Sequence, residues 1–209
     1  MDREEGGLVA LTGVAFLVLA VLGLAIGGEP PGADDGAREI VDFYVDNKDG
    51  LRVAVFIHTA AMVLLVVFGA FLRDVLQAGD GGRDFLPTIA FAGILILATG
   101  LAIDATIALA LTETAEDIDP AATQALSALF ENDYIPFALG SILFLAGLGL
   151  AVLRSGVLPK WLGWVAVVLA VVGLTPVGFV AFIGAGLLVA VISVILAMRG
   201  RRAPTPAPA

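Results

Sequence analysis

The longest uncharged stretch of the sequence is Trp161–Met198, WLGWVAVVLAVVGLTPVGFVAFIGAGLLVAVISVILAM, which holds 38 residues and no Asp, Glu, Lys or Arg. A single helix of that length would extend about 57 Å, nearly twice the hydrocarbon thickness of a bilayer, which is about 30 Å. Its middle, GLTPVG at Gly173–Gly178, has the glycine and proline residues that turns require. The stretch therefore predicts a hairpin of two membrane-spanning helices.

Four other segments are long and apolar enough to cross a bilayer. Leu8–Gly27, Val53–Leu72 and Tyr134–Leu153 are each 20 residues long and contain no acidic or basic residue, while Phe85–Leu111 has 27 residues and one acid, Asp104. A crossing helix needs about 20 apolar residues. We therefore predict an all-α, polytopic transmembrane helix bundle over residues 1–198 and a disordered cytoplasmic tail over residues 199–209. The six predicted spans are 8–27, 53–72, 85–111, 134–153, 158–174 and 177–198.

The composition supports a membrane protein and excludes several other classes. Apolar residues make up 59% of the chain, charged residues make up 15%, and the mean hydropathy is +1.01, whereas soluble domains are about half apolar and about a quarter charged. The net charge of -9 argues against nucleic-acid binding, which needs basic clusters. With no cysteine and a single histidine, disulfides, zinc sites, iron–sulfur clusters and haem ligation are not expected, and we predict no cofactor.

Charge asymmetry predicts the orientation. With the N-terminus in the cytoplasm, eight basic residues fall on the inner side and three on the outer side, as the positive-inside rule requires. The two outer loops also contain thirteen acidic residues. The sequence thus predicts a multi-pass protein of the plasma membrane with both termini cytoplasmic and an acidic outer face. The basic residues on the inner side are Arg3, Arg73, Arg83, Arg154, Lys160, Arg199, Arg201 and Arg202.

Each outer loop is predicted to contain a short amphipathic helix. In Glu29–Gly50 the apolar residues at helical spacing are Ala37, Ile40, Val41 and Tyr44. In Thr112–Asp133 a helix is expected to start at Asp119-Pro120, because Asp is a good N-cap and Pro suits the first helical position. We expect these helices to cap the bundle. The apolar face expected for the second one is Ala122, Ala125, Leu126, Leu129 and Phe130.

Two ionisable residues, His58 and Asp104, are predicted to lie within the membrane at almost equal depth on successive helices. Ionisable groups inside a bilayer are costly and so suggest a function. A carboxylate beside an imidazole can act as a proton relay, a cation site or a pH sensor, but it can equally be a polar clamp that locks two helices together. Residues placed to join this pair are Thr59, Thr106, Tyr134 and Ser141.

No motif indicates an enzyme. The sequence lacks a glycine-rich phosphate loop, a G-x-S-x-G elbow and an H-E-x-x-H helix, and we predict no catalytic activity. Small residues form one stripe on each arm of the C-terminal hairpin, which permits close packing within the chain or against a second copy or another membrane protein. The two stripes are Gly163, Ala166, Ala170 and Gly173, and Gly186, Ala190, Ser193 and Ala197.

The segment Leu153–Trp164, LRSGVLPKWLGW, carries a resemblance. An R-S-G-x-L-P-[RK]-x-L-G segment opening a penultimate helix resembles small six-helix integral membrane proteins of bacteria, common in actinobacteria, that are grouped as a domain of unknown function. The resemblance implies the six-helix architecture and no activity or catalytic residue. Within this segment, Trp161 and Trp164 are expected to anchor the helix at the membrane interface.

Three function classes remain open from the sequence, and one of them, for which no motif is present, is an enzyme or a lipid-modifying activity. Of the other two, the first is a scaffold or accessory membrane protein without chemistry of its own. The second is a small proton- or cation-coupled transporter or channel that uses His58 and Asp104. The expected surroundings are the lipid bilayer and, through the small-residue stripes, a second copy or another membrane protein.

Overall fold

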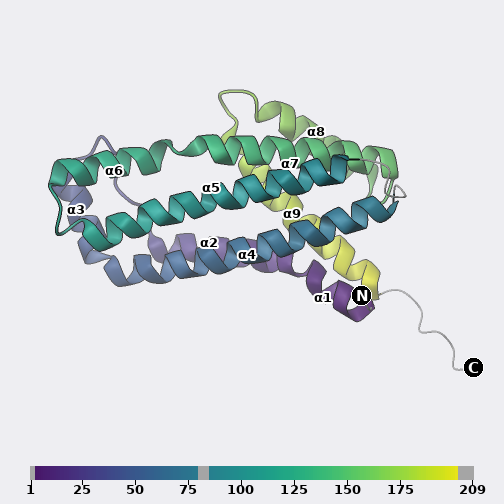
Figure 1. The fold of residues 1–209 in the computed structure, drawn as a ribbon, viewed down its shortest axis with the longest axis horizontal. Helices are drawn as coiled ribbons and strands as arrows, with labels where there is room; N and C mark the ends of the chain where they lie inside the picture. The colour runs from purple at the N-terminus through teal and green to yellow at the C-terminus, as the bar shows by residue number, and fades with distance from the viewer. Residues whose placement is uncertain (1–2, 80–84, 202–209) are drawn as a thin grey trace, which may run out of the picture.

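The computed structural model describes residues 3–79 and 85–201, and these residues form helices without any strand (Figure 1). The predicted all-α class is confirmed. The predicted tail begins inside the last helix, and its residues 202–209 lie outside the described part. In chain order the helices are α1 (Arg3–Ala10), α2 (Thr12–Gly27), α3 (Ala37–Asp46), α4 (Lys48–Gly79), α5 (Leu86–Thr114), α6 (Pro120–Asn132), α7 (Tyr134–Ser155), α8 (Lys160–Val172) and α9 (Phe179–Arg201).

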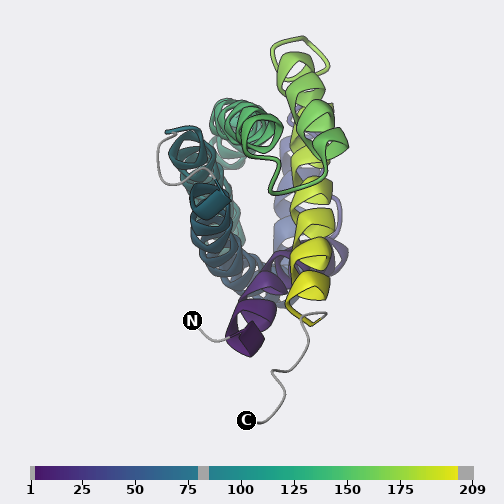
Figure 2. The same ribbon diagram turned by 90° about the vertical axis from the view of Figure 1, so that its right-hand side faces the viewer.

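The helices lie roughly along one long axis, so that the molecule has two distinct ends (Figure 1). One end, here the α3–α6 end, holds those two helices, the start of α4 and the end of α5. At the opposite end α1 begins and α9 finishes, and α7 turns into α8 (Figures 1 and 2). We call this second end the α1–α9 end.

Five helical stretches in the described residues are long and apolar enough to cross a membrane. Many of their large apolar side chains face outward, as expected for surfaces in contact with lipid. The chain therefore has the character of a membrane-spanning helix bundle. The five stretches are Glu5–Gly27, Lys48–Gly79, Leu86–Thr114, Pro120–Ser155 and Phe179–Arg199.

The fifth predicted span, 158–174, is shorter than expected. α8 has 13 residues and extends about 20 Å, less than the hydrocarbon thickness of about 30 Å. The predicted turn is present at 173–178, where the amide of Gly178 donates to the carbonyl oxygen of Thr175 at 2.9 Å. This turn stands level with the junction of α6 and α7 and short of the α3–α6 end (Figure 1). The part of the chain that the structure describes thus contains five long apolar helical stretches and one shorter apolar helix, and it does not confirm six full spans.

The first predicted span is broken near Leu11, which the sequence did not indicate. α1 ends at Ala10 and α2 begins at Thr12. Ser193 of α9 bridges the break: its hydroxyl donates to the carbonyl oxygen of Ala10 and accepts from the amide of Val14 at 3.1 Å. Backbone groups freed by a break inside an apolar helix need such partners, because lipid offers none. The α9 stripe that contains Ser193 therefore packs within the chain, against α1 and α2.

Glycines bring α5 and α7 into backbone contact. A Cβ atom added to Gly93 would lie 2.2 Å from the amide nitrogen of Phe144, and one added to Gly140 would lie 2.6 Å from that of Leu97. Gly147 meets the backbone of Ala90 in the same way, at 2.5 Å. Small residues allow such close approach between helices in a membrane, where dispersion forces and weak polar contacts replace the hydrophobic effect. This glycine seam sets how far α7 extends along α5.

The two predicted amphipathic helices are present as α3 and α6, and they pack on each other at the α3–α6 end. Asp119 caps α6 as expected, since its Oδ1 accepts from the amide of Ala121 at 2.8 Å. The inward face predicted for α3 is correct, with Ile40 and Tyr44 buried. The face predicted for α6 is partly wrong, because its rotation is set by contact with α3 and α5. Thr123 and Ser127 are buried on α6, whereas three residues expected inside are exposed: Ala122, Ala125 and Leu129.

We expect Gly140→Ala to destabilise the bundle by about 1–3 kcal/mol, because the new methyl group would force the α5 and α7 backbones apart. The matched control is Gly7→Ala on α1, where an added Cβ meets nothing within 4 Å. Alanine there should leave stability unchanged or slightly raised. Unfolding in mixed detergent micelles by SDS titration measures both variants. Equal stability of the two would contradict the seam.

Candidate functional site

The glycine seam places two carboxyl groups from different elements at the same level. Gly100 of α5 lies against Pro136 of α7, with an added Cβ atom only 2.8 Å from that of the proline. Asp104 lies about one turn farther along α5, and Asp133 immediately precedes the start of α7. The negative charge of Asp133 acts on Asp104. Two acids separated by 29 positions in the sequence thus interact electrostatically.

Tyr44 of α3 interacts electrostatically with Asp104 and so adds a phenol group to the two acids. Its side chain is 1% exposed, and its hydroxyl has no hydrogen-bond partner among the described residues. Burial, and secondarily the negative charge of Asp104, raises the pKa of Tyr44 to about 12. The hydroxyl therefore stays protonated at any physiological pH and remains available as a donor. We call Tyr44, Asp104 and Asp133 the acid–tyrosine cluster.

Unpaired buried polar atoms are found in this cluster and on α6, at the same end of the bundle. Besides the Tyr44 hydroxyl, Oδ2 of Asp133 and the hydroxyl of Thr123 on α6 are buried without a hydrogen-bond partner in the described part of the chain. Each such atom costs about 1–3 kcal/mol. Native proteins bury few of them, and those that they keep often serve a function or hold a bound ion. Three of them at one end of the bundle therefore favour a binding role for this region.

The chemistry of the cluster suits a proton or a cation of low charge. Two carboxylates in partly buried surroundings repel each other, and either a bound proton or a cation relieves that repulsion. Among the described residues no group of three or more His, Cys, Asp and Glu is arranged to hold a metal ion. The donor set is thus two carboxyl groups and one phenol hydroxyl.

His58 lies on a different face of the bundle. Its Nε2 is 3.2 Å from the carbonyl oxygen of Ala20 on α2 and, since a carbonyl can only accept, the imidazole donates. Gly23 makes room for the ring, because a Cβ atom there would lie 2.5 Å from Nε2. His58 thus ties α4 to α2.

The expected pairing of His58 with Asp104 is not formed. α4 and α5 run antiparallel with Gly69 against Ile94, and this register places His58 level with Asp104, as predicted. No hydrogen bond or ion pair joins the two in the described residues, and the groups that interact electrostatically with Asp104 are Tyr44 and Asp133. Equal depth was therefore insufficient, because His58 is rotated toward α2.

The four residues predicted to join the pair lie in different surroundings. Thr59 and Thr106 are exposed, and each hydroxyl donates to a carbonyl of its own helix, at 2.8 and 2.7 Å. Ser141 is buried with an unpaired hydroxyl deeper along α7. Tyr134 alone adjoins the cluster, directly after Asp133, and is 63% exposed. Of the functional residues that the sequence analysis did not select, Tyr44 had a usable signal, since it belonged to the inward stripe of α3.

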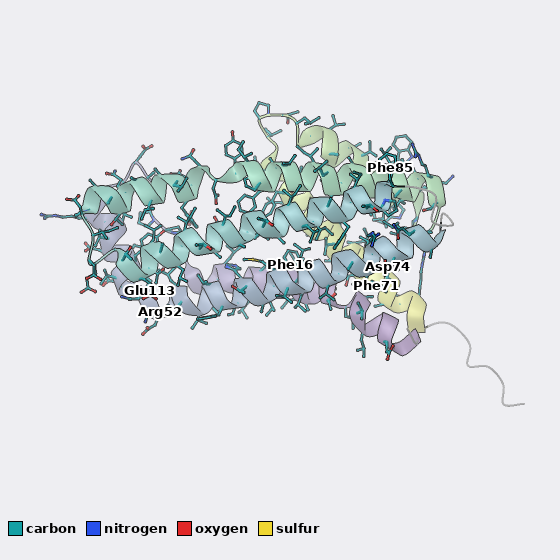
Figure 3. All side chains as sticks on the ribbon, in the orientation of Figure 1. Phe16, Arg52, Phe71, Asp74, Phe85 and Glu113 are labelled. Carbon is teal, nitrogen blue, oxygen red and sulfur yellow. The ribbon has the colours of Figure 1, made fainter. Side chains whose placement is uncertain are left out.

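An ion pair joins α4 and α5 at the α3–α6 end. Arg52 at the start of α4 and Glu113 at the end of α5 form a two-pronged pair, with Nε–Oε1 and Nη2–Oε2 distances of 2.5 and 2.6 Å (Figure 3). Gln124 of α6 donates to the carbonyl oxygens of Ala33 and Asp35 at 3.0 and 3.2 Å and so links α6 to the segment before α3. The ion pair joins the start of α4 to the end of α5, and the Gln124 contacts hold α6 to the segment that leads into α3, the helix that carries Tyr44.

Comparison with known proteins adds no assignment: no family model matches the chain, and no curated protein or solved structure is significantly similar to it.

We expect the stability effects of His58→Leu and Asp104→Leu to add within about 0.5 kcal/mol, because the two residues have different partners. The measurement is the unfolding free energy of both single variants and the double variant in detergent micelles. As a positive control, Arg52→Ala and Glu113→Ala should be clearly non-additive, since these residues pair directly. A coupling of about 1 kcal/mol or more between His58 and Asp104 would reinstate the pair.

Proposed function

We propose that this chain is a membrane protein that binds a cation in exchange for a proton at the acid–tyrosine cluster, which is the binding step of a proton-coupled cation transporter. The observation that carries the proposal is the fully buried, unpaired Tyr44 hydroxyl beside Asp104, whose second neighbour is the carboxylate of Asp133. Two shielded carboxyl groups that interact hold a proton between them until a cation replaces it.

The distribution of charge supports access from the α3–α6 end. Acidic residues are abundant in the two loops at this end, and such a surface attracts cations within about a Debye length. The cluster lies where α6 meets α7, so a ligand from that side has a short path. A scaffold or accessory role remains the alternative, and it becomes the better account if the cluster exchanges no proton.

We further propose that both termini are cytoplasmic, so that the α3–α6 end faces the exterior. Basic residues at the α1–α9 end, among them Arg73, Arg154 and Lys160, support this orientation. A reporter inserted at Gly36 should be accessible from outside intact cells, and one fused after Arg202 should be accessible only after permeabilisation. The opposite result for both reporters would overturn the orientation. If both reporters were accessible from outside, α8 and α9 would not form the hairpin that returns the C-terminus to the side of the N-terminus.

The proton step is tested by infrared spectroscopy of the purified protein. A shared proton should give a protonated-carboxyl band at neutral pH, where exposed carboxylates are ionised. The band should disappear in Asp104→Asn and shift in Tyr44→Phe, because the phenol hydroxyl polarises the carboxyl group. Asp42→Asn, an exposed acid on the same helix as Tyr44, is the matched control and should leave the band unchanged. Absence of the band in the unaltered protein, or its persistence in Asp104→Asn, would refute the proposal.

A further inference from the structure

A cavity of about 600 Å³ opens beside the acid–tyrosine cluster. It lies between the α6–α7 junction and the turn from α8 to α9, so that Asp133 belongs to both the cavity and the cluster. The volume is within the range of about 300–1,000 Å³ that small-molecule sites occupy. The residues that line it are Glu131, Asp133, Tyr134, Phe137, Ala138, Gly173, Thr175, Pro176, Gly178, Phe179 and Phe182.

The lining combines aromatic rings with negative charge. Phe137 of α7 and Phe182 of α9 pack edge to face, with their ring centroids 5.6 Å apart, and join the two helices. Tyr134 and Phe179 add two further rings, which are 63% and 66% exposed. Among the described residues that line the cavity none is basic, and the charged groups are the carboxylates of Glu131 and Asp133.

Aromatic faces and carboxylates together recognise one chemical class. The negative face of an aromatic ring attracts a cation, and the attraction is strongest for cations that shed water easily, such as quaternary ammonium groups. An anion would be repelled by the two carboxylates, and a small inorganic cation, which holds its water tightly, would gain less from the rings. The complementary ligand is therefore an organic cation with apolar substituents.

A second cavity in the described residues provides an internal comparison. It has a volume of about 450 Å³, lies between α1 and α4 toward the α1–α9 end, and contains one carboxylate, Asp74, and one aromatic ring, Phe71 (Figure 3). It lacks the multiple rings and the paired carboxylates of the first cavity. Of these two cavities, the first alone has the composition of a cation site.

We propose that the cavity between the α6–α7 junction and the α8–α9 turn binds a free, lipophilic organic cation. This inference rests on the proposed function, because Asp133 connects the cavity to Asp104. A cation seated against Asp133 adds positive charge next to the shared proton and favours its release. Affinity for the cation should therefore rise with pH, and binding should release protons.

The probe is tetraphenylphosphonium, whose phenyl groups and delocalised charge match the lining, measured by equilibrium binding of the radiolabelled ion to the purified full-length protein. We expect saturable binding that weakens about tenfold or more in Asp133→Asn and in Phe182→Ala, the loss expected when a charge or a cation–π contact is removed. Asp74→Asn and Phe71→Ala, from the second cavity, are the matched controls and should bind as the unaltered protein does. Tetraphenylborate, an anion of the same shape, should show no saturable binding.

Two further arms separate the sources of failure. Phosphatidylcholine added to the micelles should not compete with the probe; full competition would mean that a lipid headgroup is the occupant and would overturn the free-cation assignment. Asp104→Asn should retain tetraphenylphosphonium binding but lose its pH dependence and its proton release. Absence of saturable binding, with the infrared band of Asp104 present, refutes the organic cation alone, whereas binding without a band refutes the proton exchange and leaves the cavity assignment intact.

Discussion

Backbone contact between α5 and α7 is the constraint on which the rest of the bundle depends. At Gly93, Gly140 and Gly147 the two helices approach so closely that no side chain fits between them. In a membrane, apolar side chains gain little by leaving lipid, and close packing of this kind supplies much of the association energy. The seam fixes the register of α7 against α5, and with it the level at which α6 ends and the cluster forms.

The register of α7 against α5 explains why the cluster lies at the level where α7 begins and not at the middle of the bundle. α7 has 22 residues and covers about 33 Å, which is close to one hydrocarbon thickness. α4 and α5 are longer, at 32 and 29 residues, and their extra turns stand beside α3 and α6. Asp104, which counting along its segment placed inside the membrane, therefore sits beside the first residue of α7. A carboxyl group at that level can meet both protein donors and ligands from solution.

The short helix α8 has a consequence for the same region. Because α8 ends after about 20 Å, its turn into α9 lies beside the α6–α7 junction. If α8, the fifth predicted span, had full length, that turn would lie past the junction and the space where the cavity now opens would be closed. The cavity, the cluster and the close packing of α5 on α7 are thus linked through the lengths of α7 and α8.

The sequence alone determined the apolar segments, the turn at Gly173–Gly178 and the two capping helices, because hydropathy, proline and N-cap chemistry act locally. It also indicated that His58 and Asp104 lie at nearly the same level on successive helices, since the level follows from counting residues at about 1.5 Å each. The tertiary structure decided the rotation of each helix about its own axis. That rotation turned His58 toward Ala20, turned Thr123 inward, and brought Tyr44, Asp104 and Asp133 together. It depends on which glycines and side chains of neighbouring helices interlock, and residues far apart in the chain make those contacts.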